Sequence, residues 1–178
     1  MTSKKTAPAL RDGCAVRVSV AEVSGHPPKR VLIVYHSQSG HTEQLAEAAA
    51  RGASCEEGVR VKVLRAGRAT VEDLLDCDGL LLGTPENFGY MSGMMKDFFD
   101  RTYDAARGRV GNLPYAVFVS AGNDGSGAVR EIERIARGYP FKRVAEPVIA
   151  VGPVTEASLE ASRELGQTLA AGLVFGVF

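Results

Sequence analysis

From Arg30 onward, apolar segments of strand length alternate with segments of helical periodicity, five of each over roughly 145 residues. Such strict alternation predicts an α/β fold: a parallel sheet covered by helices on both faces and joined by right-handed crossovers. Pro147 in the last strand predicts an edge position or an irregularity there. The expected strands are 31–34, 59–64, 79–83, 114–120 and 144–151, and the expected helices are 42–53, 70–75, 92–107, 127–138 and 155–171.

In sheets of this kind, ligands bind at the carboxyl ends of the strands, so the loops after strands one, three and four are the candidate ligand-binding loops. The first loop, 37–42, leads from a buried strand into a helix. Gly40 lets the backbone approach an anion, and Ser37, Ser39 and Thr42 offer hydroxyl groups. Because the loop has no Lys or Arg, it predicts a phosphate site built from neutral dipoles and a helix N-terminus. An ordinary turn with a hydroxyl cap explains this stretch, taken alone, equally well.

The other two loops suggest a ring-shaped ligand. The loop 83–93 is long for a strand-to-helix connection and displays Phe88 and Tyr90, which are suited to cover a flat ring or, alternatively, to fold back onto the core. The loop 120–127 is rich in glycine and in backbone donors, although a flexible turn without a ligand has the same composition. Together the three loops predict a phosphorylated planar heterocycle as ligand.

Several ligand classes lack their sequence signatures here. There is no Gly-x-Gly-x-x-Gly after a strand, no Gly-x-x-x-x-Gly-Lys-Ser/Thr and no Gly-x-Ser-x-Gly, which argues against a dinucleotide fold, a nucleoside triphosphatase and an α/β-hydrolase. Strand three ends in Gly83-Thr84 rather than Asp, which argues against a phosphoacceptor receiver. The first loop has no Cys, which argues against a small cysteine phosphatase.

The composition limits which partners and which cellular compartment are expected for this chain. With 21 basic and 21 acidic residues, the chain offers no electrostatic case for nucleic acid or an anionic membrane. No apolar run approaches the roughly 20 residues of a membrane span. The three cysteines show no Cys-x-x-Cys or metal-ligand spacing, which favours a cytoplasmic protein without a metal site.

Both ends of the chain look distinct from the regular part. Residues 1–29 are expected to be an N-terminal extension, either flexible or a short added strand through Val16, Val18 and Val20, and 30–178 to be the domain itself. The apolar residues 173–178 are expected to pack on the core or to contact another subunit.

Two of the loops carry a family resemblance. Tyr-His-Ser-Gln-Ser-Gly-His-Thr at 35–42 resembles the phosphate loop of the flavodoxin superfamily. Gly-Thr-Pro-Glu-Asn-Phe-Gly-Tyr-Met-Ser-Gly at 83–93, continuing through Lys96 to Asp100-Arg101, is similar to the flavin loop of FMN-dependent NAD(P)H oxidoreductases, including the Trp-repressor-binding-protein-like quinone reductases. The resemblance covers about residues 30–172 and implies a flavodoxin-like three-layer sandwich with a five-stranded parallel sheet in the order 2-1-3-4-5.

The resemblance also implies FMN and the residues that would bind it. The phosphate would be held by Ser37, Ser39, Gly40, His41 and Thr42; the isoalloxazine would be lined by Thr84, Pro85, Glu86, Asn87, Phe88 and Gly89; the far wall would be formed by Ser120, Ala121, Gly122, Asn123 and Gly125. Contacts to substrate are expected from Tyr90, Glu86 and His41, and His41 stands where many relatives have Asn or another small polar residue.

The implied activity is that of an FMN-dependent oxidoreductase. NADH or NADPH would donate electrons, and a quinone, nitro compound or azo compound would accept them, in a homodimer or homotetramer. A flavodoxin-type electron carrier is the alternative, although such carriers are usually strongly acidic and this chain is neutral overall. A third possibility is a fold relative that has lost FMN and serves as a binding module.

Overall fold

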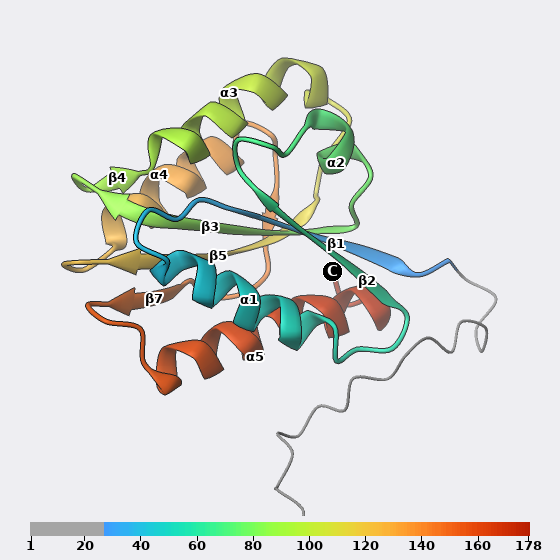
Figure 1. Cartoon of the computed structure of the whole chain (residues 1–178). Helices are drawn as coiled ribbons and strands as arrows, with labels where there is room; N and C mark the ends of the chain where they lie inside the picture. Colours follow the sequence, from blue (N-terminus) through green and yellow to red (C-terminus); the bar gives the residue numbers. More distant parts are fainter. Residues whose placement is uncertain (1–26) are drawn as a thin grey trace, which may run out of the picture.

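The computed structural model describes residues 27–178, in which five helices surround one mostly parallel sheet (Figure 1). The expected extension 1–29 therefore lies almost wholly outside the described residues. The strands are β1 (Lys29–Tyr35), β2 (Val59–Arg65), β3 (Gly79–Asn87), β4 (Tyr90–Met91), β5 (Pro114–Ala121), β6 (Lys142–Arg143) and β7 (Val148–Val151). The helices are α1 (His41–Ala53), α2 (Val71–Leu75), α3 (Gly93–Ala106), α4 (Ser126–Ala136) and α5 (Glu156–Val174).

The strand order confirms the expected topology. The sheet runs β2-β1-β3-β5, and β6 and β7 both pair with the outer side of β5. All these pairs are parallel; only the short β4 is antiparallel, to β3. Counting β6 and β7 as one interrupted strand gives the order 2-1-3-4-5.

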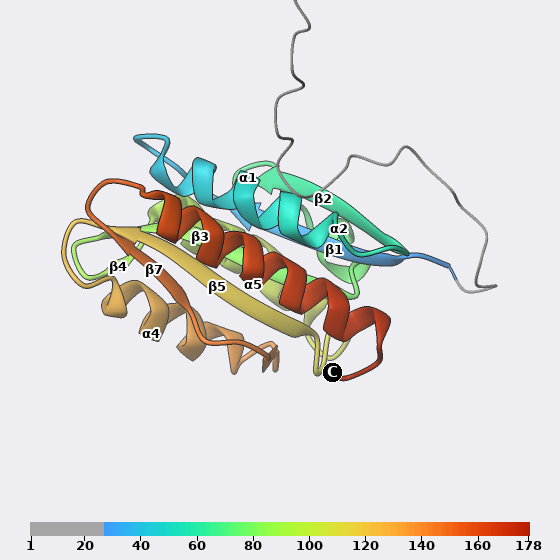
Figure 2. The same cartoon turned by 90° about the horizontal axis from the view of Figure 1, so that it is seen from below.

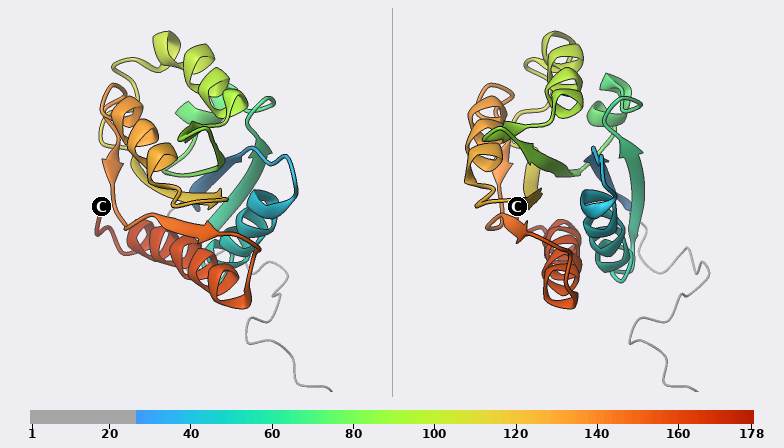
Figure 3. Two further views of the ribbon diagram at one scale, coloured as in Figure 1. Left: turned by 90° about the vertical axis from the view of Figure 1, so that its left-hand side faces the viewer. Right: turned by 60° about the vertical axis from the view of Figure 1, so that its left-hand side comes forward.

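Helices cover the two faces of the sheet as two separate layers (Figure 3). Residues of α2, α3 and α4 pack on one face and those of α1 and α5 on the other. The central strand β1 shows why: Leu32 and Val34 point into the first layer, Val31 and Ile33 into the second, and all four are buried. A strand buried on both faces must be apolar throughout, which accounts for the continuous apolar run at 31–34.

Helices α1 and α5 lie side by side beneath the sheet (Figure 2). Their close approach depends on two glycines. A Cβ at Gly52 would lie 1.8 Å from the Arg163 carbonyl oxygen, and a Cβ at Gly166 would lie 2.0 Å from that of Ala49. Only glycine permits this helix-to-helix distance at both positions.

Three expected boundaries were wrong. Strand three does not end at Gly83 but continues through Asn87 and pairs with β4, so part of the expected loop 83–93 is a hairpin. The expected strand 144–151 is split into β6 and β7, with the irregularity that Pro147 predicted between them. Helix α5 does not end before Gly172 but runs to Val174, and the missing side chain at Gly172 makes room for the Phe178 ring.

The C-terminal residues are divided between the core and solvent. Phe178 packs against the cluster beneath the sheet, whereas Phe175 and Val177 are exposed. Phe178 therefore packs on the core, as one of the two expectations for this segment had it, and the exposed residues are free for the other, a contact with another subunit. Within 27–178, no helix combines the length and the apolar character needed to cross a membrane.

Candidate functional site

The carboxyl ends of β1, β3, β5 and β7 gather at one edge of the sheet, at the left of Figure 1. The loop after β1, the β3–β4 hairpin and the loop after β5 therefore lie at the same edge, as the topology predicted. Their residues come from three separate parts of the sequence, and hydrogen bonds join them.

The N-terminus of α1 is open to a ligand. Its cap residue Gly40 has φ +87°, a left-handed conformation that favours glycine, and no side chain caps the helix. Ser37 Oγ accepts the Gly40 N–H at 3.0 Å, which closes the loop on itself. Within the described part of the chain, the N–H groups of His41, Thr42 and Glu43 meet no protein acceptor. Three free donors at the positive end of a helix dipole form an anion site.

The other helix N-termini already have partners. Thr70, Ser92 and Thr155 cap α2, α3 and α5 by accepting a backbone N–H. At α4, Asp124 accepts from Ser126 N and Glu86 accepts from Ala128 N. Of the five helices that the structure describes, α1 is thus the one left without a side-chain acceptor, which favours it over α4 as the phosphate site.

A buried hydroxyl pair joins the first loop to the third. Thr42 Oγ1 lies 2.7 Å from Ser120 Oγ, and both side chains are buried. The Thr42 hydroxyl is therefore engaged inside the protein, while the exposed Ser39 remains available to a ligand. At this loop, the Ser39 hydroxyl and the backbone N–H groups are therefore the donors that an anion could reach.

The hairpin between β3 and β4 ends in a two-residue turn, Phe88-Gly89. Both residues have positive φ, 54° and 72°, as the mirror-image turns that fit hairpin twist require. A positive φ is unfavourable for a bulky residue such as Phe88. Phe88 is also fully exposed, at 108%. The alternative in which both aromatics fold back onto the core is thus wrong for Phe88, whereas Tyr90 does pack against the core.

Thr84 and Ser92 fix the base of the hairpin. Thr84 is completely buried, and its Oγ1 accepts the Ser92 N–H at 2.9 Å. Ser92 Oγ in turn accepts Met95 N at the start of α3. Thr84 is therefore a structural bridge between β3 and α3, and the exposed residues of the hairpin are those nearer the turn.

The loop after β5 begins buried and becomes exposed. Ser120 and Ala121 are buried at the strand end, whereas Gly122 and Asn123 are exposed. Gly125 has φ +74° and begins α4 beneath the Ile149 side chain. The exposed backbone at Gly122 and Asn123 can face a ligand lying between this loop and the hairpin.

Sequence reasoning missed two groups at this edge. His36 lies directly after β1, and its backbone N–H donates to the Gly83 carbonyl at 2.9 Å. Its Nδ1 is buried without a hydrogen-bond partner among residues 27–178. Burial, and secondarily the nearby Arg65 charge, lower the pKa of His36, so the neutral ring with an unsatisfied nitrogen is favoured. The only sequence signal was a polar residue at a buried strand's end.

The second missed group is the guanidinium of Arg65, which stands beside the first turn of α1. It donates to Glu43 Oε1 at 2.6 Å and lies 5.5 Å from the Tyr35 ring centre. The Tyr35 hydroxyl donates to the same carboxylate oxygen at 2.7 Å. These two bonds lower the pKa of Glu43, and burial together with that carboxylate raises the pKa of Tyr35. Arg65 thus offsets an acidic side chain that would otherwise repel an anion at α1.

The structure thus places all the predicted site residues at one edge of the sheet, but with different exposure. Buried and engaged within the protein are Ser37, Thr42, Thr84, Ser120 and Ala121; accessible, wholly or in part, are Ser39, Gly40, His41, Pro85, Glu86, Asn87, Phe88, Gly89, Tyr90, Gly122 and Asn123; Gly125 is buried at the start of α4.

The sequence model of the family described as flavodoxin matches residues 33–166, which is well over half of the chain and includes all three loops. The chain belongs to the flavodoxin family. A flavodoxin of Aquifex aeolicus (strain VF5) is 33% identical over 157 residues, which cover 79% of this chain and 85% of that protein. An NAD(P)H dehydrogenase (quinone) of Acidithiobacillus ferrooxidans (strain ATCC 53993 / BNL-5-31) is 37% identical over 119 residues, 55% of this chain and 60% of the relative.

Solved flavodoxin structures show the same fold. An archaeal flavodoxin superimposes with a TM-score of 0.74 at 23% identity, covering 82% of this chain and 99% of its own. A flavodoxin described as WrbA-like, from Agrobacterium tumefaciens, gives 0.68 at 21% identity, covering 83% of this chain and 98% of its own. The relatives are named both flavodoxin and NAD(P)H dehydrogenase (quinone), so family membership does not decide the specific function.

Membership in the flavodoxin family implies FMN, and the residues of this site fit it. The free N–H groups at α1 suit a phosphate. The unsatisfied Nδ1 of His36 suits a hydroxyl donor, and the hairpin and the loop after β5 offer exposed backbone for a flat ring. When bound, FMN would supply hydride and electron transfer at its ring.

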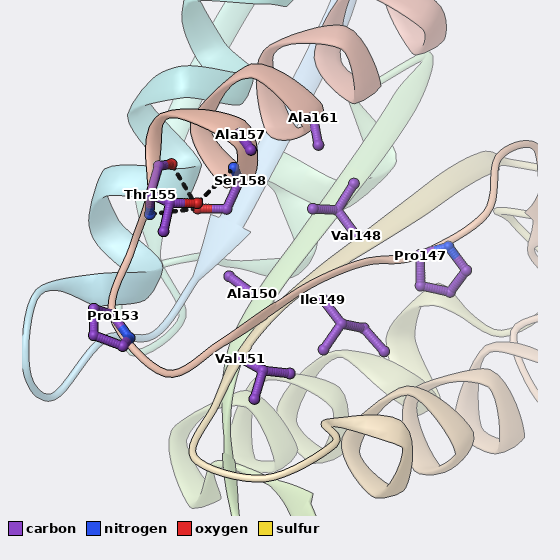
Figure 4. Close-up of a pocket in the computed structure, with 10 residues that line it drawn as sticks. All are labelled: Pro147, Val148, Ile149, Ala150, Val151, Pro153, Thr155, Ala157, Ser158 and Ala161. Atoms are coloured by element: carbon purple, nitrogen blue, oxygen red, sulfur yellow. Dashed lines mark hydrogen bonds between the residues drawn. The ribbon is translucent and has the colours of Figure 1, made fainter.

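A groove lies elsewhere, between β7 and the start of α5 (Figure 4). Its volume is about 430 Å³, and it is lined mainly by small apolar residues. Its two hydroxyl residues, Thr155 and Ser158, hydrogen-bond to each other's backbone and so cap α5. With its polar groups already paired, the groove offers little to orient a ligand, unlike the edge formed by the three loops.

Proposed function

We propose that this flavodoxin-family chain is an FMN-dependent NAD(P)H oxidoreductase that passes electrons to a quinone or another small acceptor. The single observation that carries the proposal is the uncapped N-terminus of α1, which lies at the same sheet edge as the exposed hairpin turn. The first provides the site for a phosphate and the second the border of a ring site.

In this proposal, the chain's own residues bind and orient the cofactor rather than act as acid or base. Ser39 and the N–H groups of residues 41–43 bind the phosphate, and Arg65 offsets the charge of Glu43 beside it. The hairpin backbone from Asn87 to Gly89 faces the ring edge, where N–H donors stabilise negative charge on reduced flavin. The fully exposed Phe88 leaves one side of this site apolar, as a flat acceptor such as a quinone requires.

Two observations favour an enzyme over an electron carrier. The chain has equal numbers of acidic and basic residues, whereas a dedicated carrier generally uses an excess of acidic residues to dock on basic partners. In addition, a relative that is 37% identical is named NAD(P)H dehydrogenase (quinone).

The test is turnover by the FMN-loaded protein. Full-length protein is incubated with FMN, and oxidation of NADH and of NADPH is followed with and without a soluble quinone. We expect quinone-dependent oxidation of at least one nicotinamide cofactor. Tight FMN binding without turnover, together with a reductive titration that halts after one electron, would instead assign the carrier role. Absence of FMN uptake would exclude both.

We further propose that the active form is a homodimer or homotetramer. The chain exposes Phe88 in the β3–β4 turn and, after α5, Phe175 and Val177, which are large apolar side chains that further copies would cover. Light scattering coupled to size-exclusion chromatography measures the mass directly, and a monomer at micromolar concentration would contradict this proposal.

A further inference from the structure

The β3–β4 hairpin contacts the first turn of α4 at two points. Glu86 Oε2 accepts a hydrogen bond from the Ala128 N–H at 3.1 Å, across 42 positions in the sequence. Beside it, the Gly89 backbone packs against Gly127, where a Cβ would lie only 2.2 Å from the Gly89 carbonyl oxygen. Any larger residue at Gly127 would therefore move the hairpin turn away from α4.

The contact with Glu86 suits the chemistry of a helix N-terminus. The cap residue of α4, Gly125, has no side chain to accept the first N–H groups. A carboxylate that accepts one of these groups is stabilised by both the hydrogen bond and the helix dipole. Glu86 supplies that carboxylate from a neighbouring strand, so a single bond connects the hairpin to α4.

The pairing of β3 with β4 and the core packing of Tyr90 and Met91 hold the strands of the hairpin, whereas the turn residues 88–89 are exposed. The base of the hairpin is fixed by the bond between Thr84 and Ser92, but the Phe88 side chain is fully exposed and contributes no core packing. The backbone between these two regions is the part that faces the flavin ring in the proposed function. The contacts that Glu86 and Gly127 make are those that tie this backbone to α4.

We propose that Glu86 is a positioning residue, whose carboxylate fixes the flavin-facing hairpin to the N-terminus of α4 and thereby sets the affinity for FMN. This inference rests on the proposed FMN site, and it gives Glu86 a role different from the substrate contact that the sequence suggested. Because Ala128 N needs only an acceptor oxygen, glutamine can replace glutamate in this role whereas alanine cannot.

The test compares Glu86→Ala, Glu86→Gln and the control Glu133→Ala. Glu133 lies on the same helix but pairs with Arg143, away from the hairpin. The FMN dissociation constant is measured by flavin fluorescence, and amide hydrogen exchange at residues 86–91 is measured in the FMN-free protein. For Glu86→Ala we expect roughly tenfold weaker FMN binding and roughly tenfold faster exchange. Glu86→Gln and Glu133→Ala should stay within about threefold of wild type in both measurements.

Gly127→Ala provides a second variant that leaves the carboxylate intact. It should weaken FMN binding and speed hairpin exchange in the same direction, because its Cβ displaces the Gly89 carbonyl. Wild-type behaviour of Glu86→Ala, or equal losses in Glu86→Ala and Glu86→Gln, would overturn the positioning role. If the wild type itself binds no FMN, the proposed function fails, yet the exchange measurement still decides whether Glu86 holds the hairpin.

Discussion

The Thr42 and Ser120 hydroxyl oxygens lie 2.7 Å apart in a buried hydrogen bond, although 78 positions separate the two residues in the sequence. The bond joins the first turn of α1 to the end of β5. It links α1, whose N-terminus has no side-chain cap, to the loop after β5, so a change at either residue should affect the position of the other.

Removing either hydroxyl should destabilise the protein, because the remaining one is left buried without its partner. We expect Thr42→Val and Ser120→Ala each to lower the free energy of unfolding by about 1–3 kcal/mol. The double variant should cost less than the sum of the two, by at least about 0.5 kcal/mol. Urea unfolding of the FMN-free proteins measures all three values, and strict additivity would show that the two hydroxyls do not interact.

Combined loss of the Ser39 and Thr42 hydroxyls should weaken FMN binding. Ser39 is exposed at the open end of α1, and Thr42 holds the helix turn in position through Ser120. For Ser39→Ala with Thr42→Ala we expect affinity to fall by roughly tenfold or more while the fold is retained. Ser54→Ala, at the opposite end of α1, is the matched control. Unchanged affinity in a fluorescence titration would place the phosphate elsewhere.

Arg65 should support FMN binding through its effect on Glu43. Arg65→Gln leaves the Glu43 carboxylate without its guanidinium partner beside the free N–H groups of α1, so a phosphate should be repelled. We expect weaker FMN binding at low ionic strength and recovery when Glu43→Gln is added to the same chain. The difference should shrink as salt is raised, because exposed charges are screened. A loss that Glu43→Gln does not restore would argue for a direct role of Arg65 instead.

His36 should make stability depend on pH. Its folded-state pKa lies below the unfolded value of about 6.5, so the folded protein binds fewer protons at this ring than the unfolded chain. Stability from this group is therefore complete above about pH 6.5 and declines as the pH falls through the folded pKa. Urea unfolding between about pH 8 and pH 5 should show this decline in wild type and a shallower one in His36→Gln. Parallel profiles would contradict it.

The elements that the sequence predicted well are those whose signal is local. The apolar runs at 31–34 and 79–83 require burial on both faces, and only a central position in a parallel sheet provides it. A helix was expected to begin at residue 70, and the structure shows Thr70 as the N-cap of α2. Because the loops of a parallel sheet must emerge at the strand ends, the sequence also located the edge where the three loops meet.

What only the tertiary structure decided are the partners of individual groups. The sequence could not show that Glu86 accepts a hydrogen bond from the Ala128 N–H, or that Arg65 donates one to Glu43. It also could not show that the Thr42 and Ser120 hydroxyls bond to each other. Nor could it show that the α1 N-terminus alone, among the helices of residues 27–178, is left without a side-chain acceptor. Each of these facts depends on distances between residues far apart along the chain, and such distances are fixed by how the helices pack on the sheet rather than by local preference.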